Sequence, residues 1–96
     1  MKLYQYYIDD NNKLKMVECE MKETPKMYKK VIGGLGVRKE NVDCVVLRKT
    51  YEFARRCFLS EKNPDKAIDI LTKQIEMFID YKKYYKKKLK HIKAEF

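Results

Sequence analysis

The residue types that carry most enzyme chemistry are few in this chain, and none has the spacing of a catalytic or metal site. His91 is the only histidine, and it lies among lysines rather than beside a cysteine, so the sequence does not indicate a Cys-His or Ser-His-Asp arrangement. No C-x-x-C or H-x-x-x-H spacing occurs, which argues against a zinc site. Glu18 and Glu20 would share one face of a strand, where neighbouring lysines favour a solvated surface over acid–base catalysis. We therefore predict a protein that is not an enzyme and needs no metal or cofactor.

Basic side chains are the stronger candidates for function. The 96 residues include 23 Lys and Arg against 14 Asp and Glu, which gives a net charge of +9. Near the C-terminus, lysines at helical spacing form two adjoining stripes: Lys82, Lys83, Lys86, Lys87, Lys90 and Lys93. Such stripes attract phosphate groups, but a solvated helix face that complements the helix dipole would have the same composition. Nucleic-acid binding through these lysines is therefore an alternative that the sequence leaves open.

A second basic cluster surrounds an aromatic residue in the middle of the chain. Arginines beside an exposed ring can stack on bases or contact phosphates, so Arg55 and Arg56 also belong to the nucleic-acid alternative. Tyr and Arg are equally the residues that anchor protein interfaces, and the chain has more tyrosines than one small core can hold. We predict that a protein partner is bound by the following residues: Tyr28, Arg48, Tyr51, Arg55 and Arg56.

The first half of the chain has the pattern of an antiparallel sheet. Residues 3–8 are rich in tyrosine and predict a strand, and the turn cluster 9–12 leads into a returning strand over 13–23, where apolar and charged residues alternate. Residues 26–32 resume as a third strand after Pro25. The glycine-rich stretch 33–36 matches neither a P-loop nor a dinucleotide-binding motif and predicts a turn.

Two further stretches precede the C-terminal third of the chain. The β-branched residues in 42–49 predict another strand. Residues 51–59 fit either a strand or a helix, and their aromatic content favours the strand. Together these elements predict one α+β domain over 1–96, with an antiparallel β-meander of four to five strands in 1–60 packed by one long C-terminal α-helix.

The predicted helix over 63–96 begins with strong signals. Asn63 is a good N-cap, and Pro64 is suited to the first helical position. Apolar residues then alternate at three and four positions: Ile68, Leu71, Ile75 and Phe78. The helix up to Ile79 is long enough to cover the sheet, so the second half would overhang. Its apolar residues predict packing against a second copy of the chain, a homodimer: Tyr85, Leu89, Ile92 and Phe96.

The sequence also bears on the cellular compartment. The N-terminal residues contain no continuous apolar run of the kind found in a signal peptide, and no segment approaches the roughly 20 apolar residues that span a bilayer. Cys19, Cys44 and Cys57 are an odd number of widely spaced cysteines in apolar stretches. We expect buried free thiols in a reducing cytoplasm, and no membrane contact.

Two short motifs within this order of elements carry a resemblance. An aromatic strand lies between two motifs, Glu23-Thr24-Pro25-Lys26 and Asn63-Pro64-Asp65-Lys66-Ala67-Ile68. The second motif opens a lysine-rich helix. Together they resemble small uncharacterised proteins encoded by prophages and mobile elements of low-GC Gram-positive bacteria. Anti-CRISPR proteins are drawn from the same pool. The resemblance implies a cytoplasmic protein of a bacterial host that occupies the surface of a host protein, such as a nucleic-acid-dependent defence enzyme.

Overall fold

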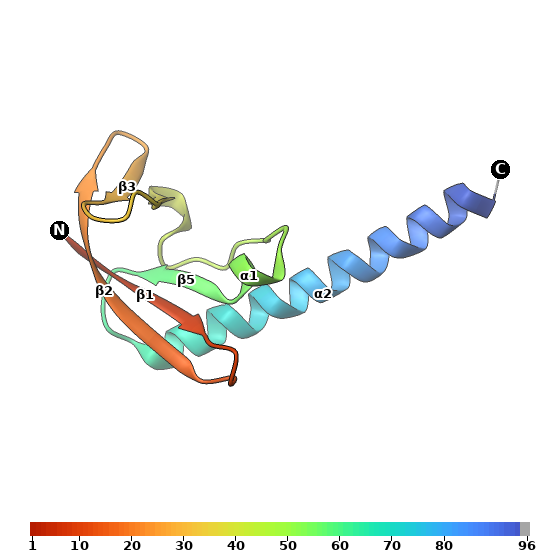
Figure 1. Cartoon of the computed structure of the whole chain (residues 1–96), viewed down its shortest axis with the longest axis horizontal. Helices are drawn as coiled ribbons and strands as arrows, with labels where there is room; N and C mark the ends of the chain where they lie inside the picture. Colours follow the sequence, from red (N-terminus) through yellow and green to blue (C-terminus); the bar gives the residue numbers. More distant parts are fainter. Residues whose placement is uncertain (95–96) are drawn as a thin grey trace.

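A computed structural model describes the backbone of residues 1–94 and the side chains of residues 1–83. It confirms the predicted fold class: the described part of the chain forms one five-stranded antiparallel sheet and one long C-terminal helix (Figure 1). The elements follow in the order β1 (Lys2–Ile8), β2 (Leu14–Glu23), β3 (Met27–Lys30), β4 (Gly36–Arg38), the 3-10 helix η1 (Lys39–Asn41), α1 (Tyr51–Ala54), β5 (Arg56–Leu59) and α2 (Pro64–Ala94).

The predicted hairpin between β1 and β2 is present. Asp9 closes it by accepting hydrogen bonds at Oδ1 from the backbone amides of Asn11 and Lys13, both at 2.9 Å. Asn12 adopts a φ of 59°, a left-handed conformation that asparagine tolerates better than most residues. The turn sets the register in which Tyr6 lies opposite Met16. The next hairpin, between β3 and β4, uses Gly33 and Gly34 at positive φ.

The strand order β4-β3-β2-β1-β5 shows that the sheet is a meander of four strands to which β5 adds at the far edge, beside β1. Strand β2 is long enough to pair with β1 over its first part and with β3 over Met21–Glu23. Figure 1 shows the hairpin of β3 and β4 raised above the β1–β5 part of the sheet. Helix α2 packs against β1 and β5 on one face of the sheet, and a cavity lies on the other face, between the two halves of the sheet.

Helix α2 begins as predicted, because Asn63 Oδ1 accepts from the backbone amide of Lys66 at 3.1 Å. Its buried face differs by one position from the predicted seam. Ala67, Ile70, Leu71 and Gln74 face the sheet, whereas Ile68 is half exposed. The reason is that a helix lying on a sheet buries an i, i+3, i+4, i+7 stripe rather than a coiled-coil seam. The apolar members of this stripe pack against one core cluster of the sheet: Tyr6, Cys57 and Leu59.

Two sequence predictions need correction. Residues 42–49 are not a strand: they run as an irregular segment from η1 to α1. Asp43 has a φ of 61°, and the Val46 amide donates to the buried side chain of Gln74 rather than to a neighbouring strand. The ambiguous stretch 51–59 divides into α1 and β5, because Thr50 Oγ1 caps the helix by accepting from the Phe53 amide at 3.3 Å.

The cysteines are free thiols, as predicted, but they differ in exposure. Cys19 and Cys57 are buried, whereas Cys44 is exposed because the irregular segment carries it to the surface. Within the described residues, no helix is both long enough and apolar enough to cross a membrane.

Candidate functional site

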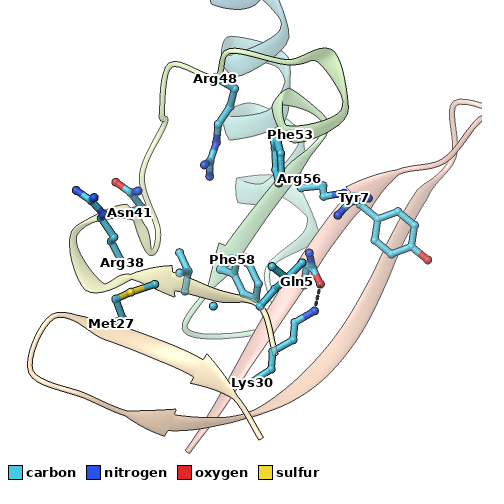
Figure 2. A pocket seen from close by; sticks show the side chains of 13 residues that line it. Gln5, Tyr7, Met27, Lys30, Arg38, Asn41, Arg48, Phe53, Arg56 and Phe58 are labelled. Atoms are coloured by element: carbon cyan, nitrogen blue, oxygen red, sulfur yellow. Dashed lines mark hydrogen bonds between the residues drawn. The ribbon is translucent and has the colours of Figure 1, made fainter. Parts of the chain in front are cut away.

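The concave face of the sheet encloses a cavity of about 450 Å³, on the side opposite α2. Figure 2 shows that its walls come from the sheet, η1, the irregular segment and α1. Gln5 and Phe58 extend from the central part of the sheet. Arg38 belongs to β4, Asn41 to η1 and Arg48 to the irregular segment. The volume lies in the range of roughly 300–1,000 Å³ that is usual for small-molecule sites.

Strand alternation explains why these side chains share one face. On β1, Tyr4 and Tyr6 pack with the helix-side cluster, so Gln5 and Tyr7 face the cavity. On β5, Cys57 faces the helix and Phe58 the cavity. Beneath the cavity lies a second core cluster: Leu3, Cys19, Met21, Val37 and Phe58. This cluster gives the cavity an apolar floor held by the sheet itself.

The cavity is strongly basic. Among the described residues, four cationic side chains and no carboxylate line it: Lys30, Arg38, Arg48 and Arg56. Two carboxylates pair with lining residues from outside. Arg38 Nη1 is 3.7 Å from Glu40 Oε1, and Arg56 Nη2 is 2.8 Å from Glu52 Oε1. Lys30 instead donates from Nζ to Gln5 Oε1 at 2.9 Å, a neutral partner that leaves its charge uncompensated.

Arg48 differs from the other three cations. Its Nε atom is buried and has no hydrogen-bond partner within the part of the chain whose side chains are described. Burial lowers the pKa of the Arg48 guanidinium below its usual value, because the charged form has lost hydration. Arginine nevertheless stays protonated in proteins, so Arg48 brings a poorly compensated positive charge to the cavity wall.

Aromatic rings stand beside these charges. Phe53, on α1, is 48% exposed and has the Arg56 guanidinium 5.9 Å from its ring centroid. Phe58, in the floor, has Lys30 Nζ 5.8 Å from its centroid. A cation held near a ring in this way also holds the ring in place. The cavity thus combines positive charge with flat apolar surfaces.

The structure brings together some of the predicted protein-binding residues. Arg48 and Arg56 line the cavity, but Tyr51 and Arg55 do not. The Arg55 guanidinium lies 4.9 Å from the centroid of the Tyr51 ring, and its Nη1 is 3.4 Å from Asp10 Oδ1. Tyr28 packs at the second core cluster, with Lys39 Nζ 5.4 Å from its ring centroid.

The predicted C-terminal stripes are described only at their beginning. Lys82 and Lys83 are exposed, and Lys82 Nζ lies 5.7 Å from the ring centroid of Phe78. The other lysines of the stripes lie outside the residues whose side chains are described: Lys86, Lys87, Lys90 and Lys93. The same holds for the residues predicted to form the homodimer: Tyr85, Leu89, Ile92 and Phe96. The predictions for both groups stay predictions.

Sequence reasoning missed several residues of the cavity, chiefly Lys30, Arg38, Phe53 and Phe58. Their signal in the sequence is weak, because they meet only when β5 pairs with β1 at the far edge of the sheet. Alternation within 26–32 did place Lys30 opposite Lys29, but it gave no indication of which face would be concave.

The described residues offer little that acts as a nucleophile or a metal ligand. Burial raises the pKa of Cys57 to about 12, so its thiol stays protonated near neutral pH. No group of three His, Cys, Asp or Glu residues placed to hold a metal ion occurs in the described part of the chain. Comparisons of the chain with protein-family models, curated proteins and solved structures found no match.

Proposed function

We propose that the protein binds single-stranded nucleic acid at the concave face of its sheet and catalyses no reaction there. One observation carries this proposal: the cavity is lined by four cations and three aromatic rings and, over the described residues, by no carboxylate. Phosphate groups supply the opposite charge, and unpaired bases stack on aromatic side chains. A nucleic acid whose phosphates and bases are both accessible can therefore contact both the cations and the aromatic rings of the cavity.

The shape of the site favours a single strand over a duplex. A cavity of about 450 Å³ has room for about one nucleotide. The bases of a duplex are stacked inside it, and its convex surface cannot enter a recess of this kind. A splayed base from a single strand can reach Phe53 at the half-exposed wall, as in other single-strand binders.

The charge of the whole chain supports the same proposal. A net charge of +9 attracts polyanions over distances longer than any contact. The exposed Lys82 and Lys83 add to this attraction without belonging to the cavity. In this proposal the lysine stripes increase the rate of encounter, and the cavity holds the ligand.

Fluorescence anisotropy with a labelled 12-nucleotide single strand, repeated at several salt concentrations, tests the proposal. The variant R48Q/R56Q should bind at least tenfold more weakly. The slope of log affinity against log salt should fall by about 1.4, or about 0.7 for each lost phosphate contact. The matched control K82Q/K83Q also removes two positive charges, but from α2 instead of the cavity. It should weaken binding by less than about threefold.

Two results would contradict the proposal. The first is a wild-type protein that shows no salt-sensitive binding at micromolar concentration. The second is an equal loss of affinity in R48Q/R56Q and K82Q/K83Q, which would assign binding to the helix lysines instead of the cavity. A labelled duplex of the same length should bind more weakly than the single strand at every salt concentration.

A second candidate function is binding to a host protein, as an inhibitor of a nucleic-acid-dependent defence enzyme. The observation that favours it is the apolar tip of the β3–β4 hairpin, where Val31, Ile32 and Leu35 are exposed, Ile32 by 88%. Single exposed apolar residues are ordinary, but a cluster of three at a hairpin tip resembles an interface anchor.

A tagged protein incubated with nuclease-treated bacterial lysate tests this second candidate. We expect capture of a defined host protein by the wild type and loss of capture by V31D/I32D, two tip residues that do not line the cavity, with the affinity for the single strand unchanged. Capture that survives V31D/I32D, or that disappears after nuclease treatment, would count against a protein interface at this tip.

A further inference from the structure

Arg48 has a feature that general attraction to polyanions does not require. An exposed lysine would supply the same charge at little cost, yet this cavity contains a guanidinium whose Nε–H is buried and unpaired within the described structure. A buried donor without a partner is costly, so an arginine at this position is better explained by what its guanidinium does in the cavity than by a contribution to stability.

The partners of the neighbouring cations make Arg48 the best placed of them to hold an anion. Arg38 and Arg56 each have a carboxylate within 4 Å, and Lys30 donates to Gln5. In the described part of the chain neither Lys30 nor Arg48 forms an ion pair with a carboxylate, and of the two only Arg48 offers a planar fork of N–H donors. That fork matches two oxygens of one phosphate group, which an ammonium group cannot do.

An aromatic surface for a base lies a few residues along the same stretch of chain. Phe53 follows Arg48 by five residues, and both side chains extend into the cavity (Figure 2). Phe58 forms the floor below them. The backbone carrying Arg48 is anchored, because the Val46 amide donates to Gln74 Oε1 at 3.1 Å. The donor fork and the rings are therefore held in a fixed arrangement, which a specific subsite needs.

We infer, on the basis of the proposed function, that the cavity is a subsite for one nucleotide, with its phosphate bound to the guanidinium fork of Arg48 and its base packed on Phe53. The phosphate takes two hydrogen bonds from the terminal Nη groups of the fork, which lie at the cavity wall. Lys30 adds charge from the floor. The inference distinguishes a built subsite from a surface that merely attracts nucleic acid.

Titration of the ¹⁵N-labelled full chain, followed by NMR, tests the inference with three probes: adenosine 5′-monophosphate, adenosine and inorganic phosphate. We expect the monophosphate to shift both the Arg48 Nε–H signal and the Phe53 amide signal. Adenosine should bind at least tenfold more weakly, and inorganic phosphate should shift Arg48 while leaving Phe53 unchanged. Equal binding of adenosine and its monophosphate would overturn the role of Arg48. Identical shifts from the monophosphate and inorganic phosphate would overturn the base contact.

Three variants separate the fork from its charge. R48K keeps the charge and loses the fork, so we expect its affinity for the monophosphate to fall at least tenfold, about as far as in R48Q. R38Q removes one charge from the same cavity, and its affinity should fall less than threefold. Wild-type affinity in R48K, or equal losses in R38Q and R48Q, would overturn the inference. Thermal unfolding of each variant checks that it is folded.

The same variants, measured with the 12-nucleotide strand, keep the two proposals apart. If the strand binds with the expected salt dependence but R48K and R38Q behave alike toward the monophosphate, the nucleotide subsite fails and nucleic-acid binding stands. If the wild type binds no strand at all, the proposed function fails, and the inference that rests on it fails with it.

Discussion

The two faces of the sheet treat buried polar groups in opposite ways. On the face that α2 covers, Gln74 is fully buried, and both its amide nitrogen and its amide oxygen are hydrogen-bonded to the backbone. Its Nε2 donates to the carbonyl oxygens of Ala54 at 3.1 Å and Arg56 at 2.9 Å, and its Oε1 accepts from Val46. On the concave face, the buried Nε of Arg48 has no partner in the described structure.

This difference indicates a division of roles. A buried amide with three well-made hydrogen bonds adds to stability and fixes the arrangement of the chain around it. A buried guanidinium donor without a partner lowers stability and is retained where binding requires it. The helix side therefore holds the fold together, and in our proposal the concave side binds the ligand. The following predictions test this division, starting with the largest expected effect.

Gln74→Leu should have the largest effect on stability. The substitution keeps the volume of the side chain but leaves the amide of Val46 and the carbonyls of Ala54 and Arg56 without their partner. Each buried group that loses its hydrogen bond costs about 1–3 kcal/mol, so we expect a loss of about 3 kcal/mol or more. Urea unfolding followed by circular dichroism measures it. Thr72→Leu, on the exposed side of the same helix, is the control. Equal stability of the two variants would show that the Gln74 bonds contribute nothing.

Arg48→Met should have a smaller effect of the opposite sign. Methionine keeps an unbranched apolar chain and removes the buried charge and its unpaired donor, so the free energy of unfolding should rise by about 1 kcal/mol. For a domain of this size that corresponds to a melting temperature about 4–8 °C higher. Differential scanning calorimetry measures the change. A melting temperature several degrees lower would mean that Arg48 stabilises the fold and that the two faces do not differ in this way.

Asp43→Asn should have the smallest effect, a loss of stability near neutral pH that disappears in acid. Burial raises the pKa of Asp43, but the hydrogen bonds from Ser60 and the charge of Lys66 outweigh it and hold the pKa below its usual value. A carboxyl group whose pKa is lowered by folding stabilises the protein above its unfolded pKa, near 4. That contribution is lost as the pH falls through the folded pKa.

The expected result for Asp43→Asn is therefore a shallower fall in the free energy of unfolding below about pH 4 than in the wild type. Asparagine tolerates the positive φ at this position, so the backbone is not strained. Urea unfolding at several pH values measures the slope, and Glu61→Gln removes a negative charge from an exposed residue as the control. An identical acid response in the wild type and Asp43→Asn would assign the pH dependence to other carboxyl groups.

Local signals in the sequence predicted several of the regular elements. The alternation in β2, the turn at Asp9 and the capping sequence Asn63-Pro64 each depend on neighbours a few residues away, and each is present in the structure. The fold class follows from their order. The same signals indicate little about residues 42–49, whose β-branched side chains favour a strand but whose Val46 amide is bonded to the Gln74 side chain.

The cavity could not be predicted from the sequence, because it depends on contacts between distant segments of the chain. Its cations come from β3, β4, the irregular segment and β5, and they meet because β5 crosses to the edge beside β1. Sequence reasoning selected Arg48 and Arg56 for their type and their position near Tyr51. It gave no reason to separate them from Arg55, which ends α1 one residue before Arg56 and whose side chain lies beside Tyr51 and Asp10 instead of at this cavity.

The hydrogen bond between Val46 and Gln74 also governs how fast this part of the chain exchanges protons with water. Residues 42–50 form an irregular segment, where amide hydrogens normally exchange with deuterium quickly through small local openings. The Val46 amide donates instead to a fully buried side chain, so we expect it to exchange as slowly as an amide within the sheet. Because Val46 lies two residues before Arg48, this wall of the cavity would open only when the packing of α2 against the sheet is lost.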